Sequence, residues 1–354
     1  MSAPINPALA AAPLLSVRDL NVHIPTPGGT LHAVRGVNFD LQPGEVLGLA
    51  GESGSGKSVT LRALLGLHQK PIRVTGEVHS GGQNLLTLPE SRLRSVRGAQ
   101  ISMIYQEPMS ALNPVLSVGE QITENLREHL GLRGRAALDR AAELLDLTGI
   151  PSPRARLSDY PHQFSGGMRQ RAMIAIALAS EPKLLLADEP TTALDVTIQD
   201  QILRLLLRLR EELKMAVILV THDLGVIAQT CDRVAVMYGG RLMETAPVTE
   251  LFRQPRHAYS LGLLRSLPGA GEWRVPLQPI PGGPPDLRAV MTGCAFAPRC
   301  AFVTGECRQQ EPPLVNVGPE HTSACLHAAD LPSPHPAAPA GNAAQPTQIP
   351  EVNA

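Results

Sequence analysis

Short apolar runs alternate with amphipathic stretches along the chain from Leu14 to about Ala246. This alternation predicts an α/β domain, in which helices cover a central sheet. Five runs have the length and the continuous apolar character of buried strands. They are Val46–Ala50, Ile101–Tyr105, Leu184–Asp188, Val217–Thr221 and Arg233–Tyr238. A helix is predicted over Val59–Leu67, shortly after the first of these strands.

Helical patterns dominate the middle of the domain, from about Pro108 to Ala179. Ser117 followed by Glu120 has the spacing of a capping box, which marks the start of a helix. Arg135–Leu147 places apolar residues three and four positions apart, as on one face of a helix. Asp195 is expected to cap a further helix with a single apolar stripe, which is typical of core packing. The stripe consists of Ile198, Ile202, Leu205, Leu206 and Leu209.

The two ends of the chain differ from this domain in composition. Residues 1–13 form an Ala/Pro-rich segment without periodicity, which predicts a disordered tail. Prolines become frequent after Ala246, and four cysteines fall within residues 294–325. We therefore predict a main domain over residues 14–265, a loop-rich extension over 266–327 and a disordered Ala/Pro tail over 328–354.

Composition limits the classes of function. The chain has 354 residues, 43% of them hydrophobic, which is enough for a sizeable core. A net charge of −1 argues against a nucleic-acid binder that depends on phosphate neutralisation. No apolar run approaches the roughly 18 residues that span a bilayer, and residues 1–13 lack the pattern of a signal peptide. A soluble, cytosolic protein is expected, which would need separate membrane subunits in order to drive transport.

A glycine-rich segment follows the first predicted strand and has the full phosphate-loop pattern. Its glycines let backbone N–H groups approach phosphates, and the next helix presents its positive end to them. Lys57 is expected to reach the β- and γ-phosphates, and the Ser58 hydroxyl to ligate Mg²⁺. An ordinary Gly/Ser turn is the alternative, but the strand–loop–helix context favours a nucleotide site. The segment consists of Gly51, Glu52, Ser53, Gly54, Ser55, Gly56, Lys57 and Ser58.

Two acidic residues end the strand Leu184–Asp188. Asp188 follows four apolar residues, so its carboxylate is expected at the exposed end of a buried strand, where it can hold Mg²⁺. Glu189 points elsewhere and is suited to polarise an attacking water as general base. Solvated strand-end acids are the alternative, which the neighbouring phosphate loop disfavours.

Residues Phe164–Arg171 (FSGGMRQR), Leu184–Pro190 (LLLADEP) and Ala193–Asp195 (ALD) complete a set of motifs. Together with the phosphate loop, they resemble the signature loop, the Walker B strand and the D-loop of ABC ATPases. The resemblance covers residues 14 to about 265. It implies a RecA-like core with an inserted helical subdomain over about 108–179, and ATP sandwiched between two such domains.

The resemblance also assigns roles to single residues. Gln106 matches the Q-loop glutamine, which contacts Mg²⁺ and senses the membrane partner, and His222 matches the switch histidine at the γ-phosphate. Asp195 matches the D-loop aspartate at the dimer contact. The signature residues, which would bind the γ-phosphate held by the opposite domain, are Ser165, Gly166 and Gly167.

Two positions depart from the usual ABC pattern. Met168 stands where glutamine is commoner in the signature. No Tyr, Phe or Trp lies between Leu14 and Asn38, where such a residue usually stacks on adenine, and Ile24 or His32 is expected to take that place. Neither departure touches a residue required for phosphoryl transfer, so an active ATPase is predicted.

Further segments resemble ATPase subunits of oligopeptide and dipeptide importers. They are Gln106–Pro114 (QEPMSALNP), His257–Ser260 (HAYS), Ile280–Leu287 (IPGGPPDL) and Gly293–Cys300 (GCAFAPRC). Phe164 with Met168 is similar to the D-type member of the two ATPases in such systems. Peptide, nickel and glutathione importers share these features, so the cargo stays open between them.

This resemblance implies several partners. They are two integral-membrane permease subunits, a second, F-type ATPase that forms a heterodimer with this chain, and indirectly an extracytoplasmic substrate-binding protein. The permease contact is expected around residues 106–119, beside the nucleotide site. A peripheral location at the cytoplasmic face of the inner membrane follows.

The four cysteines of the extension have the spacing C-x5-C-x6-C-x17-C; they are Cys294, Cys300, Cys307 and Cys325. In a reducing cytosol such a group suggests a metal site rather than disulfides. The C-x2-C pairs typical of structural zinc are absent. Thiolates in irregular loops suit either an iron–sulfur cluster or zinc, and the importer resemblance favours [4Fe–4S]. Free thiols are the third alternative. Cys231 is expected to be a small buried apolar residue.

Two rival classes of function remain to be weighed. A soluble ABC protein of DNA repair or translation would carry coiled-coil insertions, tandem ATPase domains or basic arms, and this sequence has none. A module that senses ATP without hydrolysis is disfavoured by the presence of Glu189 and His222. The prediction is an ATP-hydrolysing subunit of a peptide-class ABC importer, with ATP and Mg²⁺ as ligands.

Overall fold

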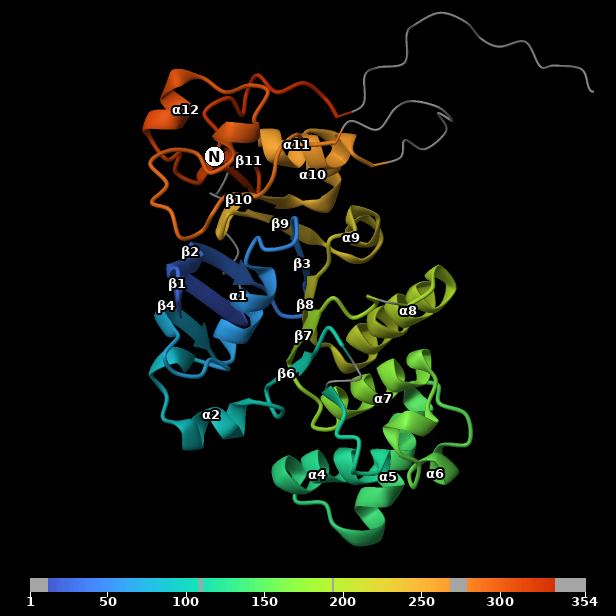
Figure 1. Ribbon diagram of the computed structural model, residues 1–354. Helices are drawn as coiled ribbons and strands as arrows, with labels where there is room; N and C mark the ends of the chain where they lie inside the picture. The colour runs from blue at the N-terminus through green and yellow to red at the C-terminus, as the bar shows by residue number, and fades with distance from the viewer. Residues whose placement is uncertain (1–11, 108–110, 193, 268–278, 335–354) are drawn as a thin grey trace, which may run out of the picture.

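A computed structural model describes residues 12–107, 111–192, 194–267 and 279–334 (Figure 1). Two sheets organise these residues. The first is antiparallel, in the order β2-β1-β4-β5. Its strands are β1 (Leu15–Thr26), β2 (Gly29–Leu41), β4 (Arg73–Ser80) and β5 (Gln83–Asn84).

The second sheet has eight strands in the described part of the chain, in the order β11-β12-β10-β9-β3-β8-β7-β6. The parallel central strands are β3 (Val46–Ala50), β6 (Ile101–Ile104), β7 (Leu184–Asp188), β8 (Ala216–Val220) and β9 (Arg233–Tyr238). Three of the predicted strands have the predicted bounds, and the other two end one residue early. Because these strands are buried on both faces, their sequences are almost continuously apolar.

Alternate residues of the central strands face two different layers. Leu47, Leu49 and Leu186 pack with the antiparallel sheet and helix α1 (Lys57–Leu64) in one core cluster. Val46 and Leu185 belong to a second cluster with α7 (Gly166–Leu178), α8 (Val196–Leu213) and α9 (Leu224–Thr230). The parallel strands are thus covered on both sides, and the residues that follow their carboxyl ends come together.

The helical region forms its own small core. It contains α4 (Val118–Leu130), α5 (Gly134–Leu147), α6 (Pro153–Arg156) and α7. Of these, α4, α5 and α7 pack around a cluster that includes Phe164. The capping box predicted from Ser117 and Glu120 is present at the start of α4. In Figure 1 these helices lie at the opposite end of the molecule from the C-terminal part. The short helix α2 (Glu90–Val96) precedes β6.

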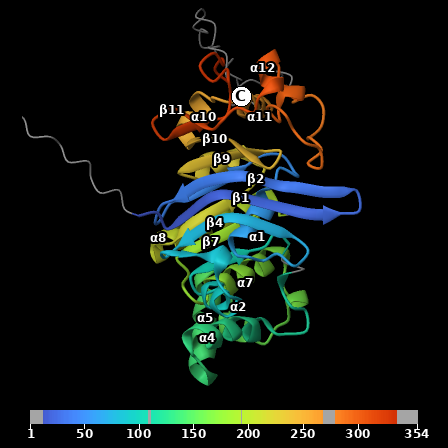
Figure 2. The ribbon, with the colours of Figure 1, turned by 90° about the vertical axis from the view of Figure 1, so that its left-hand side faces the viewer.

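The C-terminal part continues the main sheet. Strand β10 (Arg241–Pro247) pairs with β9 and with β12 (His321–Ser323), and β12 pairs with β11 (Val315–Gly318). Its helices are α10 (Val248–Arg253), α11 (Ala258–Arg265) and α12 (Gly305–Gln309), with a 3₁₀ turn η3 at Ala297–Arg299. Figure 2 shows these elements stacked on the edge of the sheet.

The structure refines three sequence predictions here. The helix predicted over Val59–Leu67 begins two residues earlier, at Lys57, and ends at Leu64. The loop-rich extension contains two strands that join the main sheet. Buried Leu331 packs in the C-terminal core, so the ordered part passes the predicted boundary at residue 327. Residues 1–11 of the predicted tail over 1–13, and residues 335–354 of the predicted tail over 328–354, lie outside the described residues. None of the described helices is long and apolar enough to cross a membrane.

Candidate functional site

The phosphate loop connects β3 to α1, as its sequence predicts. Gly51 and Gly56 have φ angles of 142° and 103°, in the region that favours glycine. A Cβ atom at Gly51 would collide with the backbone oxygen of Met237 on β9, and one at Gly56 with the backbone oxygen of Ala33 on β2. The glycines therefore allow the loop to lie directly against both neighbouring strands.

Lys57 is the first residue of α1, and its side chain folds back over the loop. Its Nζ donates hydrogen bonds to the carbonyl oxygens of Gly51 at 2.7 Å and Glu52 at 2.9 Å, and to Ser55 Oγ at 3.3 Å. Burial lowers the pKa of Lys57, and the carboxylates of Glu189, Asp188 and Glu52 oppose that shift. The ammonium group thus lies in a buried position that faces several acids.

Asp188 ends β7 beside the start of α1. The Ser58 hydroxyl donates a hydrogen bond of 2.7 Å to Asp188 Oδ1, whereas buried Asp188 Oδ2 has no hydrogen-bond partner. Burial raises the pKa of Asp188, and the bond from Ser58 opposes the shift. A buried carboxylate oxygen without a partner, next to a hydroxyl, is the donor set that Mg²⁺ prefers. These two residues fit the predicted metal position.

Glu189 is held by groups from three different segments. Gln106, after β6, donates to Glu189 Oε2 at 3.0 Å, and the Thr192 hydroxyl donates to the same oxygen at 2.8 Å. His222, after β8, places Nδ1 3.5 Å from Glu189 Oε1. Glu189 has a φ of 47°, a strained conformation for a residue with a side chain. The structure therefore brings together three residues that the sequence analysis placed in the site. Thr192 was missed, because a threonine three residues after a glutamate is no motif by itself.

The signature residues lie at the start of α7. Ser165 caps this helix, since its Oγ accepts a hydrogen bond from the Met168 N–H at 3.3 Å. A Cβ at Gly167 would lie 3.1 Å from Ile198 Cγ2 at the start of α8. That helix is capped by Asp195, which accepts a bond of 3.0 Å from the Ile198 N–H. The signature and the D-loop residues thus adjoin one another. Ala193 lies outside the described residues.

The residues proposed to replace the adenine-stacking aromatic lie on the hairpin of β1 and β2. The ring of His32 stacks on His23 at a centroid distance of 4.0 Å, and its Nε2 lies 3.0 Å from Asn21 Oδ1. Burial, with additional repulsion from nearby cations, lowers the pKa of His32 to about 4. The imidazole of His32 offers an aromatic face, so His32 fits this role better than Ile24.

The four cysteines of the C-terminal part are unpaired thiols. They are neighbours: burial raises the pKa of Cys294 to about 11, and Cys325, Cys300 and Cys307 add to the shift. Cys307 Sγ lies 3.5 Å from His327 Nε2, a residue that the sequence analysis did not consider. Yet no group of three or more potential ligands among the described residues is arranged to hold a metal ion. The side chains, as placed, do not fit the predicted cluster.

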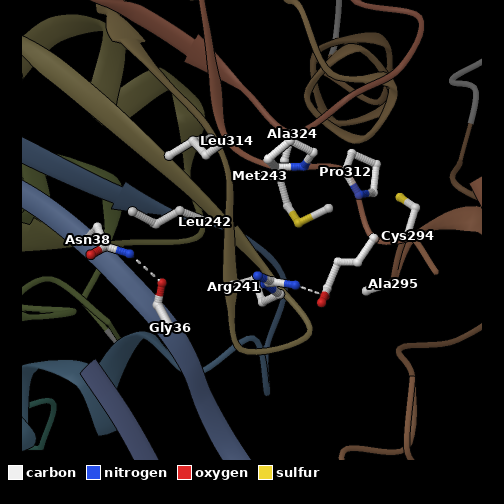
Figure 3. Close-up of a pocket in the computed structure, with 12 residues that line it drawn as sticks. Gly36, Asn38, Arg241, Leu242, Met243, Cys294, Ala295, Pro312, Leu314 and Ala324 are labelled. Carbon is white, nitrogen blue, oxygen red and sulfur yellow. Dashed lines mark hydrogen bonds and ion pairs between the residues drawn. The ribbon is translucent and has the colours of Figure 1, made fainter. Parts of the chain in front are cut away.

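A cavity of about 300 Å³ lies beside Cys294, between β2, β10 and the C-terminal part (Figure 3). Arg241 forms an ion pair with Glu311 at its wall. The other lining residues include Gly36, Leu242, Met243 and Leu314. No phosphate-loop residue lines this cavity, so it is distinct from the site built around Lys57 and Asp188.

Comparisons with known proteins agree with this geometry. The family described as ABC transporter matches residues 34–192, and the family described as oligopeptide/dipeptide transporter, C-terminal region, matches residues 243–307. A Brucella abortus (strain 2308) protein named for peptide import and ATP binding is 52% identical over 306 residues, which cover 86% of this chain and 92% of that protein.

Two relatives are named oligopeptide transport ATP-binding protein OppD. The protein of Bacillus subtilis (strain 168) is 50% identical over 313 residues, which cover 87% of each chain. The protein of Escherichia coli (strain K12) is 48% identical, with 88% of this chain and 93% of that protein covered. Among solved structures, the dimeric post-hydrolysis state of the ATP-binding cassette MJ0796 bound to ADP and Pi has a TM-score of 0.60 at 29% identity. The matched residues cover 66% of this chain and 98% of the MJ0796 chain.

Proposed function

Because this chain belongs to the ATP-binding subunits of ABC transporters, in the oligopeptide/dipeptide branch, we propose that it hydrolyses ATP at the site around Lys57 in order to drive peptide import. The observation that carries this proposal is the convergence of Glu189, Gln106 and His222 beside the Ser58–Asp188 pair. Phosphoryl transfer needs positioning and charge stabilisation above all, and these groups supply both.

Each residue has a role that follows from its contacts. Lys57 would exchange its bonds to backbone carbonyls for bonds to the β- and γ-phosphates. Ser58 and Asp188 would hold Mg²⁺, which neutralises phosphate charge when it is bound. Glu189 would accept the proton of the attacking water while the water oxygen bonds to the γ-phosphorus and the bond from that phosphorus to its bridging oxygen breaks, which releases ADP and phosphate. Gln106 and His222 orient Glu189, and by the family resemblance they would also contact Mg²⁺ and the γ-phosphate, respectively, when these are bound.

The second half of each site comes from another subunit in this proposal. Ser165, Gly166 and Gly167 form the start of α7, whose N–H groups suit the γ-phosphate held by the opposite domain. The D-type sequence features support a heterodimer with an F-type ATPase, and Asp195 would lie at its contact.

The remaining partners are membrane proteins. Two permease subunits would dock around residues 106–119, of which Pro108–Ser110 lie outside the described residues, and an extracytoplasmic binding protein would deliver cargo. This places the chain peripherally at the cytoplasmic face of the inner membrane. Closure of the ATPase dimer would move the permease, which couples hydrolysis to transport. Peptides are the proposed cargo because the relatives are named for peptide transport. Nickel and glutathione are the alternatives.

A [4Fe–4S] cluster, with zinc as the alternative, remains a proposal for Cys294, Cys300, Cys307 and Cys325. The mutual proximity of the thiols supports it, whereas their arrangement does not yet form a ligand set. Brown colour with absorption near 400 nm after anaerobic purification would support iron, whereas a colourless, zinc-containing protein would refute the iron–sulfur cluster in favour of zinc. No step of ATP hydrolysis depends on this group.

The catalytic assignment is tested by Glu189→Gln. The amide retains the size of the side chain but accepts no proton, so steady-state hydrolysis should disappear while ATP binding persists. Unchanged turnover would remove Glu189 from its role as base. The assembly is tested by mass spectrometry of proteins that co-purify with the tagged chain from solubilised native membranes. Two permeases and a second ATPase are expected, and recovery with ribosomes or DNA would overturn the transport function.

A further inference from the structure

The side chain of Glu52, inside the phosphate loop, is bound by an arginine from the C-terminal part of the chain. Arg299 Nη1 donates to Glu52 Oε2 at 2.7 Å, and Arg299 Nη2 donates to Glu52 Oε1 at 3.0 Å. The pair therefore has the two-pronged geometry that makes arginine–carboxylate contacts strong and directional. It joins residues 247 positions apart in sequence.

The arginine is embedded in a rigid setting. Its side chain is only 7% exposed, and its remaining N–H groups donate to Pro281 O at 2.8 Å and to the Tyr238 hydroxyl at 3.2 Å. Its guanidinium carbon lies 5.6 Å from the ring centroid of Tyr238, within cation–π range. Because these partners fix the guanidinium of Arg299, it holds the carboxylate of Glu52 in one position.

The backbone of the phosphate loop is held by the same region. The Glu52 N–H donates to the hydroxyl of buried Tyr259 on α11 at 2.8 Å. Gly240, in the turn between β9 and β10, donates its N–H to Ser55 O at 3.1 Å. The carbonyl of Glu52 in turn accepts from Lys57 Nζ. A continuous set of contacts thus runs from Arg299 through Glu52 to the lysine of the ATP site.

The contact with Arg299 also balances the negative charge of Glu52. A carboxylate in a loop that cradles a triphosphate repels the ligand unless a cation balances it. Arg299 supplies that cation from outside the loop and leaves Lys57 free to engage phosphate. We propose that Arg299 is a positioning residue for ATP: it neutralises and fixes Glu52, so that the C-terminal part of the chain sets the nucleotide affinity of the phosphate loop. This inference rests on the proposed role of that loop in binding ATP.

The proposal predicts a particular pattern of variants of the full chain, measured as the Kd of fluorescent mant-ATP with Mg²⁺. Arg299→Met keeps the apolar stem but leaves Glu52 unbalanced, and should weaken binding about tenfold, as for one uncompensated charge near a polyanion. Glu52→Gln alone removes the repelling carboxylate and leaves the cation Arg299 in place, so it should not weaken binding, and its Kd should be no higher than that of the wild type. The double variant should recover most of the affinity lost in Arg299→Met.

The recovery separates positioning from a structural role. Both Arg299→Met and the double variant lose the hydrogen bonds of Arg299 to Pro281 O and to the Tyr238 hydroxyl. If Arg299 acted only through these structural contacts, the double variant would therefore show no recovery of affinity. Arg288→Met is the matched control, because Arg288 forms a similar two-pronged pair with Asp286 in the same part of the chain but is exposed. Its Kd should equal that of the wild type.

Three results would overturn the proposal. They are a wild-type Kd in Arg299→Met, a double variant as weak as Arg299→Met, and an equal loss in Arg288→Met. If Arg299→Met does not fold, Arg299→Lys carries the test: it keeps the charge but loses the fork, and should weaken binding at least about threefold. Lys57→Ala separates the two levels of inference. Retained binding in Lys57→Ala refutes the proposed ATP site itself, whereas lost binding there with unchanged Arg299 variants refutes only the role of Arg299.

Discussion

Replacing Glu244 with glutamine is expected to destabilise the C-terminal part strongly, because this residue joins three of its segments. Glu244 lies on β10 and is fully buried. Its Oε1 accepts hydrogen bonds from the Arg256 N–H at 2.5 Å and from His321 Nε2 on β12 at 2.7 Å. Its Oε2 accepts from the His257 N–H at 3.0 Å. Both carboxyl oxygens are therefore acceptors, on opposite sides of the group.

The magnitude follows from what glutamine can accept. Its amide has one acceptor oxygen and one donor nitrogen, so one backbone N–H, of Arg256 or of His257, must face an NH₂ group. A buried donor left without a partner costs about 1–3 kcal/mol. A loss of about 2–3 kcal/mol corresponds to a fall of about 3–4 °C in the unfolding midpoint for a chain of 354 residues, because the entropy of unfolding is about 2.1 cal/mol/K per residue.

Calorimetric unfolding of the purified chain measures the effect. Glu250→Gln is the matched control, since it removes an exposed ion pair to Arg253 that is worth less than about 1 kcal/mol. If Glu244→Gln unfolds within about 1 °C of the wild type, the three hydrogen bonds do not contribute as their geometry indicates. Equal losses in the two variants would likewise refute the reasoning.

Two further predictions concern other parts of the molecule. Ser117→Ala removes the cap of α4, because Ser117 Oγ accepts a hydrogen bond from the Glu120 N–H at 3.2 Å. Chemical denaturation should show a loss of about 1 kcal/mol in the free energy of unfolding, whereas the control Ser95→Ala should be near neutral. Burial lowers the pKa of His257 to about 4, so only the unfolded chain binds its proton between pH 6.5 and 4. Stability should therefore fall as the pH drops, by about 2 kcal/mol between pH 7 and pH 5 from this residue alone. A His257→Gln variant whose stability falls as steeply over that range would contradict the assignment.

The parts of the site that depend on local sequence could be predicted. The strand, loop and helix around Lys57 follow from a buried apolar run and from glycines that adopt positive φ. The capping residues Ser117 and Asp195 each accept a hydrogen bond from the backbone N–H three residues later in the sequence. In each case the interacting groups are close in sequence, so their spacing alone carries the information.

The pairing of distant segments could not be predicted in the same way. The register of β1 against β2 and β4 depends on side chains from three separate segments, and the sequence analysis did not delimit these strands. The contact between Arg299 and Glu52 has no spacing signal, because the two residues meet only after β9, β10 and the C-terminal part have packed. The cysteine spacing, conversely, suggested a metal group that the side chains do not form.

The ATP site combines residues that the sheet positions with one residue, Glu52, that the C-terminal part of the chain positions. The residues proposed for phosphoryl transfer lie at or after the ends of β3, β6, β7 and β8, so the sheet sets their relative positions. Glu52 is the exception, since its carboxylate is bound by the C-terminal part and not by the sheet. Changes in that part can therefore reach the phosphate loop through this ion pair and through the hydrogen bonds of Tyr259 and Gly240 to the loop backbone, none of which involves Asp188 or Glu189. The affinity for ATP and the rate of hydrolysis are thus open to separate adjustment in this chain.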